Sequence, residues 1–229
     1  MTAPMQLPTG TYFVTGIDTD IGKTIATGYI ARQLHDAGCR VITQKLIQTG
    51  CQSQADDIIT HRAMMGVPLL AEDSERLTMP MVLSYPASPH LASQIDGVAV
   101  DLDAIRHSTQ VLSSRYDVVL VEGAGGLMVP LLDCTADSDG DDGLVIDYIA
   151  KQGYPVILVT SGRLGSINHT LLSLKALARY GLTVFAVAYN LNDDSQDTII
   201  ADDTKRYLQA YLAKHHPQAK WWQIPVFKN

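Results

Sequence analysis

The sequence has few cysteines and no long apolar run. Only Cys39, Cys51 and Cys134 occur among its 229 residues, and no Cys-x-x-Cys spacing is present. This composition excludes a disulfide framework and a cysteine-based zinc site, and it favours reduced thiols in a cytoplasmic protein. The longest apolar runs, such as 155–159, are too short to cross a bilayer. Residues 1–10 lack the pattern of a signal peptide. We therefore expect a cytoplasmic protein without a membrane partner.

Basic residues are also in deficit. The chain has 17 Lys and Arg against 24 Asp and Glu, which gives a formal net charge of −7. Nucleic-acid-binding proteins usually carry a basic footprint, so we expect no nucleic-acid partner. The length suits a single domain spanning residues 1–229. A hydrophobic content of 46% is typical of a folded globular protein.

Short apolar runs alternate with longer amphipathic stretches. The segments 118–121 and 156–159 are apolar without alternation, as expected for strands buried on both faces of a parallel sheet. The pattern predicts a single-domain α/β fold with a mostly parallel sheet and helices on both faces. The predicted strands are 11–15, 40–46, 117–121, 155–160 and 183–189, and the predicted helices are 23–37, 56–65, 101–115, 144–152, 167–180 and 198–214.

Local signals mark helix ends and a loop. Gly38 and Gly181 stand where helix C-terminal caps are expected, and Asp101 is a suitable N-cap. The segment 134–143 is acidic and rich in turn residues. We interpret it as a surface loop inserted into the domain.

The most informative motif runs from Gly16 to Thr24. It reads Gly-Ile-Asp-Thr-Asp-Ile-Gly-Lys-Thr and lies between a predicted strand and a predicted helix. This is the context of a phosphate-binding loop, in which the lysine reaches the outer phosphates and the hydroxyl ligates Mg²⁺. Five residues separate Gly16 from Gly22, one more than usual. The motif predicts a site for a nucleoside triphosphate.

Polar residues follow the other predicted strands. Lys45 ends the second strand, where a cation can stabilise a transferring phosphoryl group. Glu122 ends the third strand, where enzymes with a phosphate-binding loop hold Mg²⁺. Asp56 and Asp57 open a helix, and either is a helix cap or a second metal carboxylate, with Asp56 the better candidate for the metal.

The fourth and fifth strands lead to weaker signals. After the fourth comes 161–169, in which a helix begins near Ser166. This helix start is either a simple cap or a second anion site. Asn190 after the fifth strand suits a purine edge or an ordinary turn.

Together these segments resemble the dethiobiotin synthetase family, the ATP-dependent cyclases of biotin synthesis. The resemblance runs from about residue 11 to 225. It rests on residues 12–24, Ser-Pro-His at 88–90, Val-Glu-Gly-Ala-Gly-Gly at 121–126 and Leu-Gly-Ser-Ile-Asn-His at 164–169. The expanded phosphate loop is typical of this family. The chain departs from the family in having Leu46 where Pro is common and Asp20 where Glu is commoner.

The resemblance implies a reaction of 7,8-diaminononanoate with CO₂ (or bicarbonate) and ATP, with Mg²⁺ as cofactor. One amine becomes a carbamate, whose oxygen takes the γ-phosphoryl group. The second amine then attacks the carbonyl and expels phosphate, which closes the ureido ring. The resemblance also implies a homodimer whose active site is shared between subunits.

The resemblance implies a role for each matching position. The catalytic residues would be Lys45, Lys23 and Thr19, and the ligands of Mg²⁺ would be Thr24, Asp56 and Glu122. The diamine substrate would contact Lys45, Thr49, Gly165, Ser166, Ile167 and Asn168, the last four from the neighbouring subunit. ATP would contact Asp20, Ile21, Gly22, Lys23, Thr24, Ile25, Asp56, Glu122, Gly123, Ala124, Gly125, Asn190, Leu191, Pro225, Val226 and Phe227.

Three alternatives compete with this interpretation. A glutamine-dependent amidoligase needs a glutaminase domain, for which this chain is too short. A ParA/MinD-like ATPase switch usually has an early second lysine in the phosphate loop, whereas Ile, Asp and Thr follow Gly16 here. A phosphate-loop protein that regulates without turnover is distinguished only by measurement.

Overall fold

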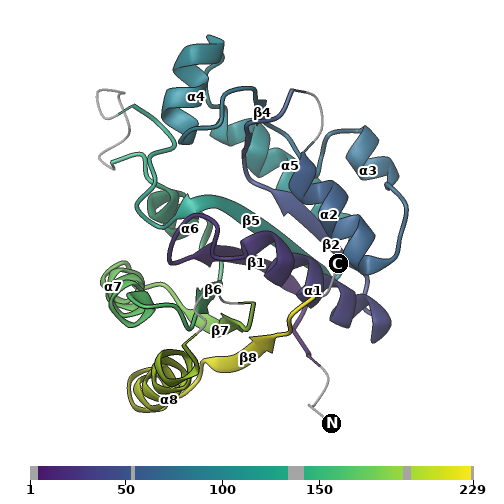
Figure 1. Cartoon of the computed structure of the whole chain (residues 1–229). Helices are drawn as coiled ribbons and strands as arrows, with labels where there is room; N and C mark the ends of the chain where they lie inside the picture. Colours follow the sequence, from purple (N-terminus) through teal and green to yellow (C-terminus); the bar gives the residue numbers. More distant parts are fainter. Residues whose placement is uncertain (1–4, 53–54, 134–141, 193–196, 228–229) are drawn as a thin grey trace.

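A six-stranded parallel sheet forms the centre of the structure, a computed structural model that describes residues 5–52, 55–133, 142–192 and 197–227. The strand order is β2-β5-β1-β6-β7-β8, and every neighbouring pair is parallel (Figure 1). The strands are β1 (Gly10–Gly16), β2 (Val41–Lys45), β5 (Val118–Gly126), β6 (Val156–Ser161), β7 (Val184–Asn190) and β8 (Lys220–Ile224). The predicted parallel α/β fold is confirmed.

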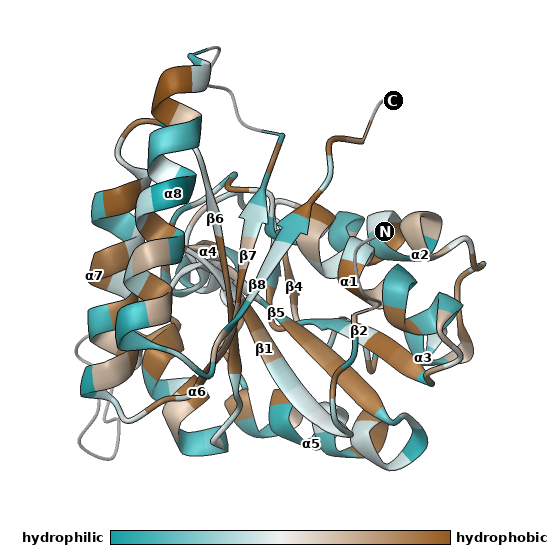
Figure 2. Cartoon of the chain, turned by 90° about the horizontal axis from the view of Figure 1, so that it is seen from below, coloured by the Kyte–Doolittle hydropathy of each residue, from teal (hydrophilic) through white to brown (hydrophobic). Residues whose placement is uncertain are grey.

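The interior strands are apolar because both faces of the sheet are covered. All of β6 and the first seven residues of β5 are buried, and these strands are among the hydrophobic segments in Figure 2. One cluster of buried side chains packs α1 (Lys23–Asp36) on one face. A second cluster packs α5 (Leu102–Arg115), α6 (Val145–Gln152) and α7 (Ser166–Arg179) on the other. Helices therefore cover both faces, as predicted.

All five predicted strands and all six predicted helices occur, the latter including α2 (Asp56–Met65) and α8 (Thr198–His215). Asp101 caps α5 by accepting a hydrogen bond from the Ala104 amide at 2.8 Å. Gly38 and Gly181 have φ of 83° and 67°, as expected of glycines that end helices. The predicted acidic loop 134–143 lies, except for its last two residues, outside the described part of the chain.

The described residues also form five short elements that the sequence pattern does not predict: β3 (Gln48–Thr49), β4 (Val82–Leu83), α3 (Ala71–Ser74), α4 (Pro89–Asp96) and β8. The first three are too short to show a periodicity. β8 is an edge strand whose exposed Lys220 and Gln223 interrupt its apolar pattern. None of the helices in the described ranges combines the length and the apolar character that a bilayer crossing requires.

The chain order creates a crevice at the carboxyl end of β1. From β1 the chain runs to the edge strand β2 and returns through β5, whereas β6 lies on the opposite side of β1. In open parallel sheets, ligands bind at the point where the connections diverge in this way. The segments that follow β1, β2, β5, β6 and β7 therefore meet at one edge of the sheet.

A buried ion pair fastens α2 to the segment that contains α3. Arg62 Nη2 lies 2.8 Å from Asp73 Oδ1, and both residues are buried. Thr78 Oγ1 donates a further hydrogen bond to Asp73. Burial alone raises the pKa of Asp73, but hydrogen bonds from Arg62 outweigh burial and lower it. The carboxylate is therefore ionised and matched to its guanidinium.

We expect Asp73→Asn to lower the free energy of unfolding by about 3–5 kcal/mol, because it leaves the buried Arg62 charge without its partner. Urea denaturation measures this change. The control is Asp103→Asn, which breaks the exposed pair with Arg106 and should cost less than about 1 kcal/mol.

The loss of unfolding free energy in Asp73→Asn depends on pH. Because the pKa of Asp73 is lowered on folding, its carboxylate stabilises the fold above the unfolded pKa of about 3.9, and this contribution is lost as pH falls. The difference in the free energy of unfolding between wild type and Asp73→Asn should therefore decrease at acid pH. Equal losses for the two variants at neutral pH would contradict the assignment.

Candidate functional site

The turn between β1 and α1 has the geometry of a phosphate-binding loop. Gly22, the N-cap of α1, has φ of 92°. A Cβ atom on it would lie 2.3 Å from Asn190 Nδ2, so no side chain fits there. Asp20 also has a positive φ, 57°, which is uncommon outside glycine. Lys23 Nζ donates a hydrogen bond to the Asp18 carbonyl at 3.0 Å, so the lysine folds back over the loop.

A cluster of charged side chains lies beside this loop. Lys45 Nζ is 2.5 Å from Asp57 Oδ2 and 2.8 Å from Glu122 Oε1. The Lys45 side chain is 7% exposed and that of Glu122 is 0% exposed, so the pair is shielded from water. Strand register brings them together, because Lys45 on β2 pairs with Glu122 on β5.

The charges fix one another's protonation. Burial alone lowers the pKa of Lys45, yet the charges of Glu122 and Asp57 outweigh burial and raise it. Burial alone raises the pKa of Glu122, but Lys45 and His61 together hold it well below its usual range. The pKa of Lys23 is lowered by burial and by the neighbouring charge of Lys45. The cluster therefore contains a protonated Lys45 and an ionised Glu122.

Three oxygen-bearing side chains suit a small divalent cation. The Thr24 hydroxyl oxygen lies 2.9 Å from Asp57 Oδ1 and 3.2 Å from Glu122 Oε1. A hydroxyl and two carboxylates form a donor set for Mg²⁺, which typically takes one or two carboxylates and completes its shell with water and phosphate oxygens. Among the described residues, no group of three or more His, Cys, Asp and Glu side chains is arranged to hold a metal without such help.

The structure places Asp57, rather than Asp56, beside Thr24 and Lys45. The Asp56 carboxylate accepts a hydrogen bond from the Cys51 thiol at 3.3 Å, away from the cluster. Both aspartates lie in the first turn of α2, where adjacent side chains point in directions about 100° apart. Only one of the two can face the phosphate loop.

Two connected cavities open at this edge of the sheet. The first, of about 420 Å³, is lined by Thr19, Asp20, Gly22, Lys23, Thr24, Ile25, Lys45, Ile47, Gln48, Thr49, Asp57, Glu122, Ala124 and Gly125. The second, of about 380 Å³, shares Thr19, Thr49, Ala124 and Gly125 with the first and extends to the segment 86–89. The Ser-Pro-His motif at 88–90 thus begins at the wall of the second cavity.

The residues expected at the base of a nucleotide meet at the other end of the phosphate loop. Asn190 pairs with Ile224 across β7 and β8, so Leu191 lies beside the start of 225–227. The Asn190 amide donates to the Ile21 carbonyl at 3.0 Å. The Phe227 ring packs edge-on against Tyr29 of α1, with 5.7 Å between ring centroids.

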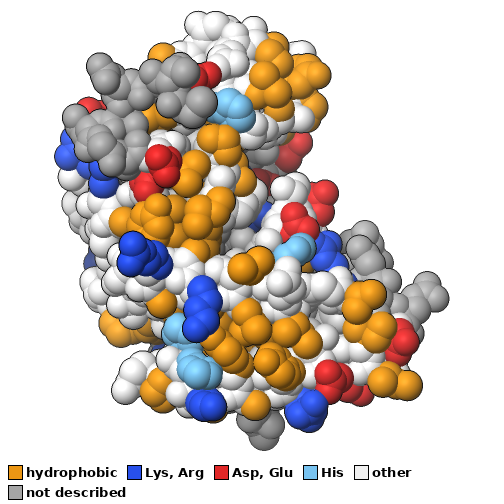
Figure 3. Space-filling view, turned by 90° about the vertical axis from the view of Figure 1, so that its left-hand side faces the viewer, with side chains coloured by type: hydrophobic (Ala, Val, Ile, Leu, Met, Phe, Trp, Pro, Cys, Tyr) orange, Lys and Arg blue, Asp and Glu red, His pale blue; other side chains and the backbone are white. Residues whose placement is uncertain are grey.

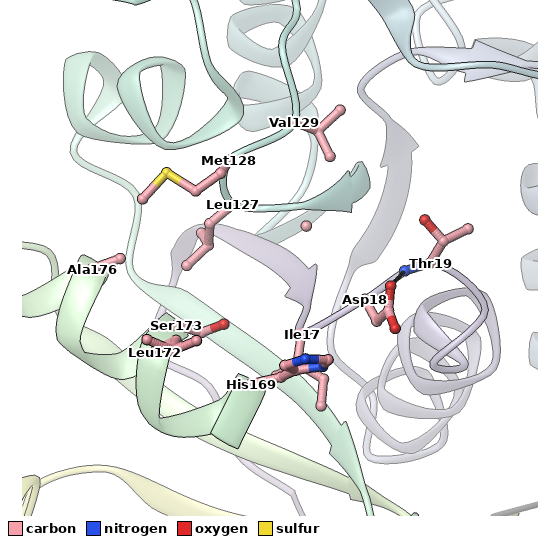
Figure 4. A pocket seen from close by; sticks show the side chains of 11 residues that line it. Ile17, Asp18, Thr19, Leu127, Met128, Val129, His169, Leu172, Ser173 and Ala176 are labelled. Atoms are coloured by element: carbon pink, nitrogen blue, oxygen red, sulfur yellow. Dashed lines mark hydrogen bonds between the residues drawn. The ribbon is translucent and has the colours of Figure 1, made fainter. Parts of the chain in front are cut away.

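A third cavity separates the phosphate loop from α7. It measures about 390 Å³, and Figure 4 shows it between 17–19, 127–129 and α7 residues such as His169 and Leu172. Gly165, with φ of 94°, begins α7. Ser166 is buried, with its hydroxyl 3.3 Å from that of Ser161. An ion pair of 2.6 Å between Arg163 and Asp18 links this segment to the phosphate loop.

Residues 165–168 form the N-cap and the first turn of α7. Neither cavity beside Lys45 is lined by these four residues. Within one subunit, therefore, the helix start expected to hold a substrate carboxylate does not line either of these two cavities.

His61, which was not predicted as a site residue, is fully buried on α2, and its Nε2 lies 3.0 Å from Glu122 Oε2. The spacing of His61 from Asp57 could have pointed to it. Asp57 and His61 are four residues apart on a predicted helix and therefore share one face. That face, which includes Asp57 rather than Asp56, points at Glu122.

Comparison with known proteins agrees with this geometry. A family model described as an AAA domain matches residues 10–216. The chain is 48% identical over 206 residues to an ATP-dependent dethiobiotin synthetase from Pasteurella multocida, covering 90% of this chain and 92% of that protein. The chain belongs to the dethiobiotin synthetase family.

Other synthetases of the family match as well. The protein of that name from Haemophilus influenzae is 51% identical over 178 residues, covering 78% of this chain and 89% of its own length. The one from Chlorobaculum tepidum is 45% identical over 202 residues, covering 88% and 81%. This relationship favours the synthetase interpretation over the ParA/MinD alternative.

Solved structures agree at the level of the fold. The signal recognition particle receptor FtsY from Elizabethkingia anophelis, in complex with GDP, matches with a TM-score of 0.50 and 14% identity over 96% of this chain. Chloroplast FtsY from Physcomitrella patens gives 0.50 and 11% over 99% of this chain. The chain spans only 58% and 62% of those two chains, so the likeness concerns the fold alone.

The different positions of the Asp56 and Asp57 carboxylates predict different effects of their substitution. We expect Asp57→Asn to raise the Mg²⁺ concentration needed for half-maximal ATP turnover by at least about tenfold, because even indirect partners of metal ligands cost about 10- to 100-fold when removed. A Mg²⁺ titration at fixed ATP measures this effect. Asp56→Asn is the matched control and should behave as wild type. A larger effect of Asp56→Asn would contradict the placement.

Proposed function

We propose that this chain is an ATP- and Mg²⁺-dependent dethiobiotin synthetase. The observation that carries the proposal is the buried Lys45, held by Glu122 and Asp57 beside Lys23 and Thr24 of the phosphate loop. A cation in this position can stabilise negative charge that develops during transfer of a phosphoryl group. The substrates would be 7,8-diaminononanoate, CO₂ (or bicarbonate) and ATP.

The nucleotide would lie along the first cavity. Backbone amides of 20–25 at the start of α1 suit its phosphates, since a helix N-terminus attracts anions. Asn190 and Leu191, with Pro225, Val226 and Phe227, would hold the adenine. The position of Asn190 against Gly22 supports this arrangement, because it joins the base end to the phosphate end.

The metal would be held by Thr24, Asp57 and Glu122, whose oxygens converge in the structure. When bound, Mg²⁺ supplies positive charge that offsets the phosphates. Lys45 would contact the carbamate formed from one amine and CO₂, and would stabilise its oxygen as that oxygen takes the γ-phosphoryl group. The second amine would then attack the carbamate carbonyl and expel phosphate, closing the ureido ring.

The protein's contribution would be orientation and charge rather than covalent chemistry. Thr19 lines all three cavities, and Thr49 and the glycine-rich segment 123–125 lie between the first two. The second cavity, beside Thr49, is suited to the diamine chain because its wall at 86–89 is largely apolar. A site of this kind positions two amines without needing a nucleophile of its own.

We further propose a homodimer with shared sites. Gly165, Ser166, Ile167 and Asn168 would receive the substrate carboxylate from the neighbouring subunit, because the α7 dipole favours an anion at this end. Exposed apolar side chains near α7 support a contact here: Leu164 is 82% exposed and Leu172 60%. Figure 3 shows hydrophobic patches on the side of the molecule where α7 lies.

The expected location of the enzyme is the cytoplasm. Cys39 and Cys51 are both free thiols in the structure. Three cysteines without a Cys-x-x-Cys spacing are typical of proteins from a reducing compartment, in which thiols persist.

The direct test measures ATP hydrolysis with and without 7,8-diaminononanoate and bicarbonate, with mass detection of the cyclic urea. We expect turnover to depend on the diamine and to yield one ureido product per ATP. Hydrolysis that ignores the diamine and gives no urea would refute the synthetase and favour a nucleotide-dependent switch.

Subunit mixing tests the shared site. Lys45→Ala should abolish ring closure and still bind nucleotide, and Asn168→Ala should impair capture of the diamine. If each site combines Lys45 of one subunit with Asn168 of the other, a random mixture recovers about one quarter of wild-type activity, because half of the dimers are mixed and each has one intact site. A mixture no more active than its parents would contradict sharing.

A further inference from the structure

His61 binds the one oxygen of Glu122 that the phosphate loop does not contact. Glu122 Oε1 lies 2.8 Å from Lys45 Nζ and 3.2 Å from the Thr24 hydroxyl. Glu122 Oε2 lies 3.0 Å from His61 Nε2. Both His61 and Glu122 are 0% exposed, so water does not replace this contact. The two carboxylate oxygens therefore have separate partners on opposite sides.

The direction of the hydrogen bond follows from its neighbours. An ionised carboxylate only accepts, so His61 Nε2 carries the hydrogen. On the other side of the ring, Nδ1 lies 3.0 Å from Thr43 Oγ1, which itself accepts from Arg62 Nη1 at 2.8 Å. The hydroxyl hydrogen of Thr43 is then left for Nδ1. The ring is held from both sides.

This arrangement continues into the buried pair that fastens α2. Arg62 donates to Asp73 through Nε and Nη2, at 2.9 and 2.8 Å. The hydrogen-bonded series from Asp73 through Arg62, Thr43 and His61 ends at Glu122, and all five side chains are buried. A buried network whose members are all bonded holds its groups in one geometry.

We infer that His61 is a positioning residue for the MgATP site, which holds Oε2 of Glu122 so that Oε1 faces Thr24 and the metal. The inference rests on the proposed function, because it gives Glu122 the role of a metal ligand. Without the imidazole, Oε2 would be a buried charged oxygen with no donor, and the carboxylate would turn to satisfy it. Partners that orient a ligand in this way are generally worth about 10- to 100-fold in metal affinity.

The test compares two substitutions of His61. His61→Leu removes the donor, whereas His61→Gln keeps an N–H that can reach Glu122. We expect His61→Leu to raise the Mg²⁺ concentration for half-maximal turnover by about 10- to 100-fold, with the KM for the diamine unchanged. His61→Gln should restore most of the loss. Ile58→Ala, a buried substitution on the same helix, is the control for lost packing and should leave the Mg²⁺ requirement unchanged.

A binding measurement separates this inference from the proposed reaction. Mn²⁺, which reports by electron paramagnetic resonance, is titrated into each variant with saturating ATP, and its affinity should follow the same order without any turnover. If His61→Leu binds Mn²⁺ as tightly as Ile58→Ala, or if His61→Gln is as weak as His61→Leu, the positioning role is refuted. Either result stands whether or not ring closure is observed.

Discussion

The ion pair between Lys45 and Glu122 is the interaction on which the site depends. Each charge alone would be costly in this shielded position, because desolvation of a buried ion is worth several kcal/mol. The two are brought together by register, since Lys45 on β2 is the direct neighbour of Glu122 on β5. Correct assembly of the sheet and formation of the site are therefore one event. A slip of one residue between these strands would bury two separated charges.

The same pair limits what can enter the site. Glu122 Oε1 is shared by Lys45 and Thr24, and Asp57 contacts both of them as well. A metal ion that takes these carboxylates competes with the ammonium group, which is then free to contact another anion. In the proposed reaction, metal binding and the orientation of Lys45 toward the carbamate would be coupled, because both involve Glu122 and Asp57.

The sequence was sufficient to predict the fold, and to predict that the phosphate loop, Lys45 and Glu122 lie at one edge of the sheet, because the signals were local. A few consecutive residues are enough to predict the apolar strands at 118–121 and 156–159. The same holds for the turn from Gly16 to Thr24. Lys45 and Glu122 each follow a predicted parallel strand, so both were expected at the same edge of the sheet. The choice between Asp56 and Asp57 could not be made in this way, because it depends on the rotation of α2 about its axis.

His61 and the edge strand β8 lie beyond local signals for a related reason. A histidine on a helix is informative only when its partner across the fold is known, and Glu122 is 61 positions away in sequence. β8 is recognised by its pairing with β7 rather than by its own polar and apolar order. Resemblance to a family supplies residue roles, but it did not supply these contacts.

The contact between Asn190 and the turn at Gly22 has a consequence for nucleotide selection. The Asn190 amide now bonds the Ile21 carbonyl, and its oxygen accepts from the Asn192 amide. A base edge that engages this side chain must take the place of one of those partners. If Asn190 holds the base as proposed, occupancy of the base end and the conformation of the phosphate turn would be linked, and the linkage would be reciprocal. Nucleotides with different bases would then differ in the affinity of the phosphate loop for their triphosphate, as well as in their contacts to the base ring.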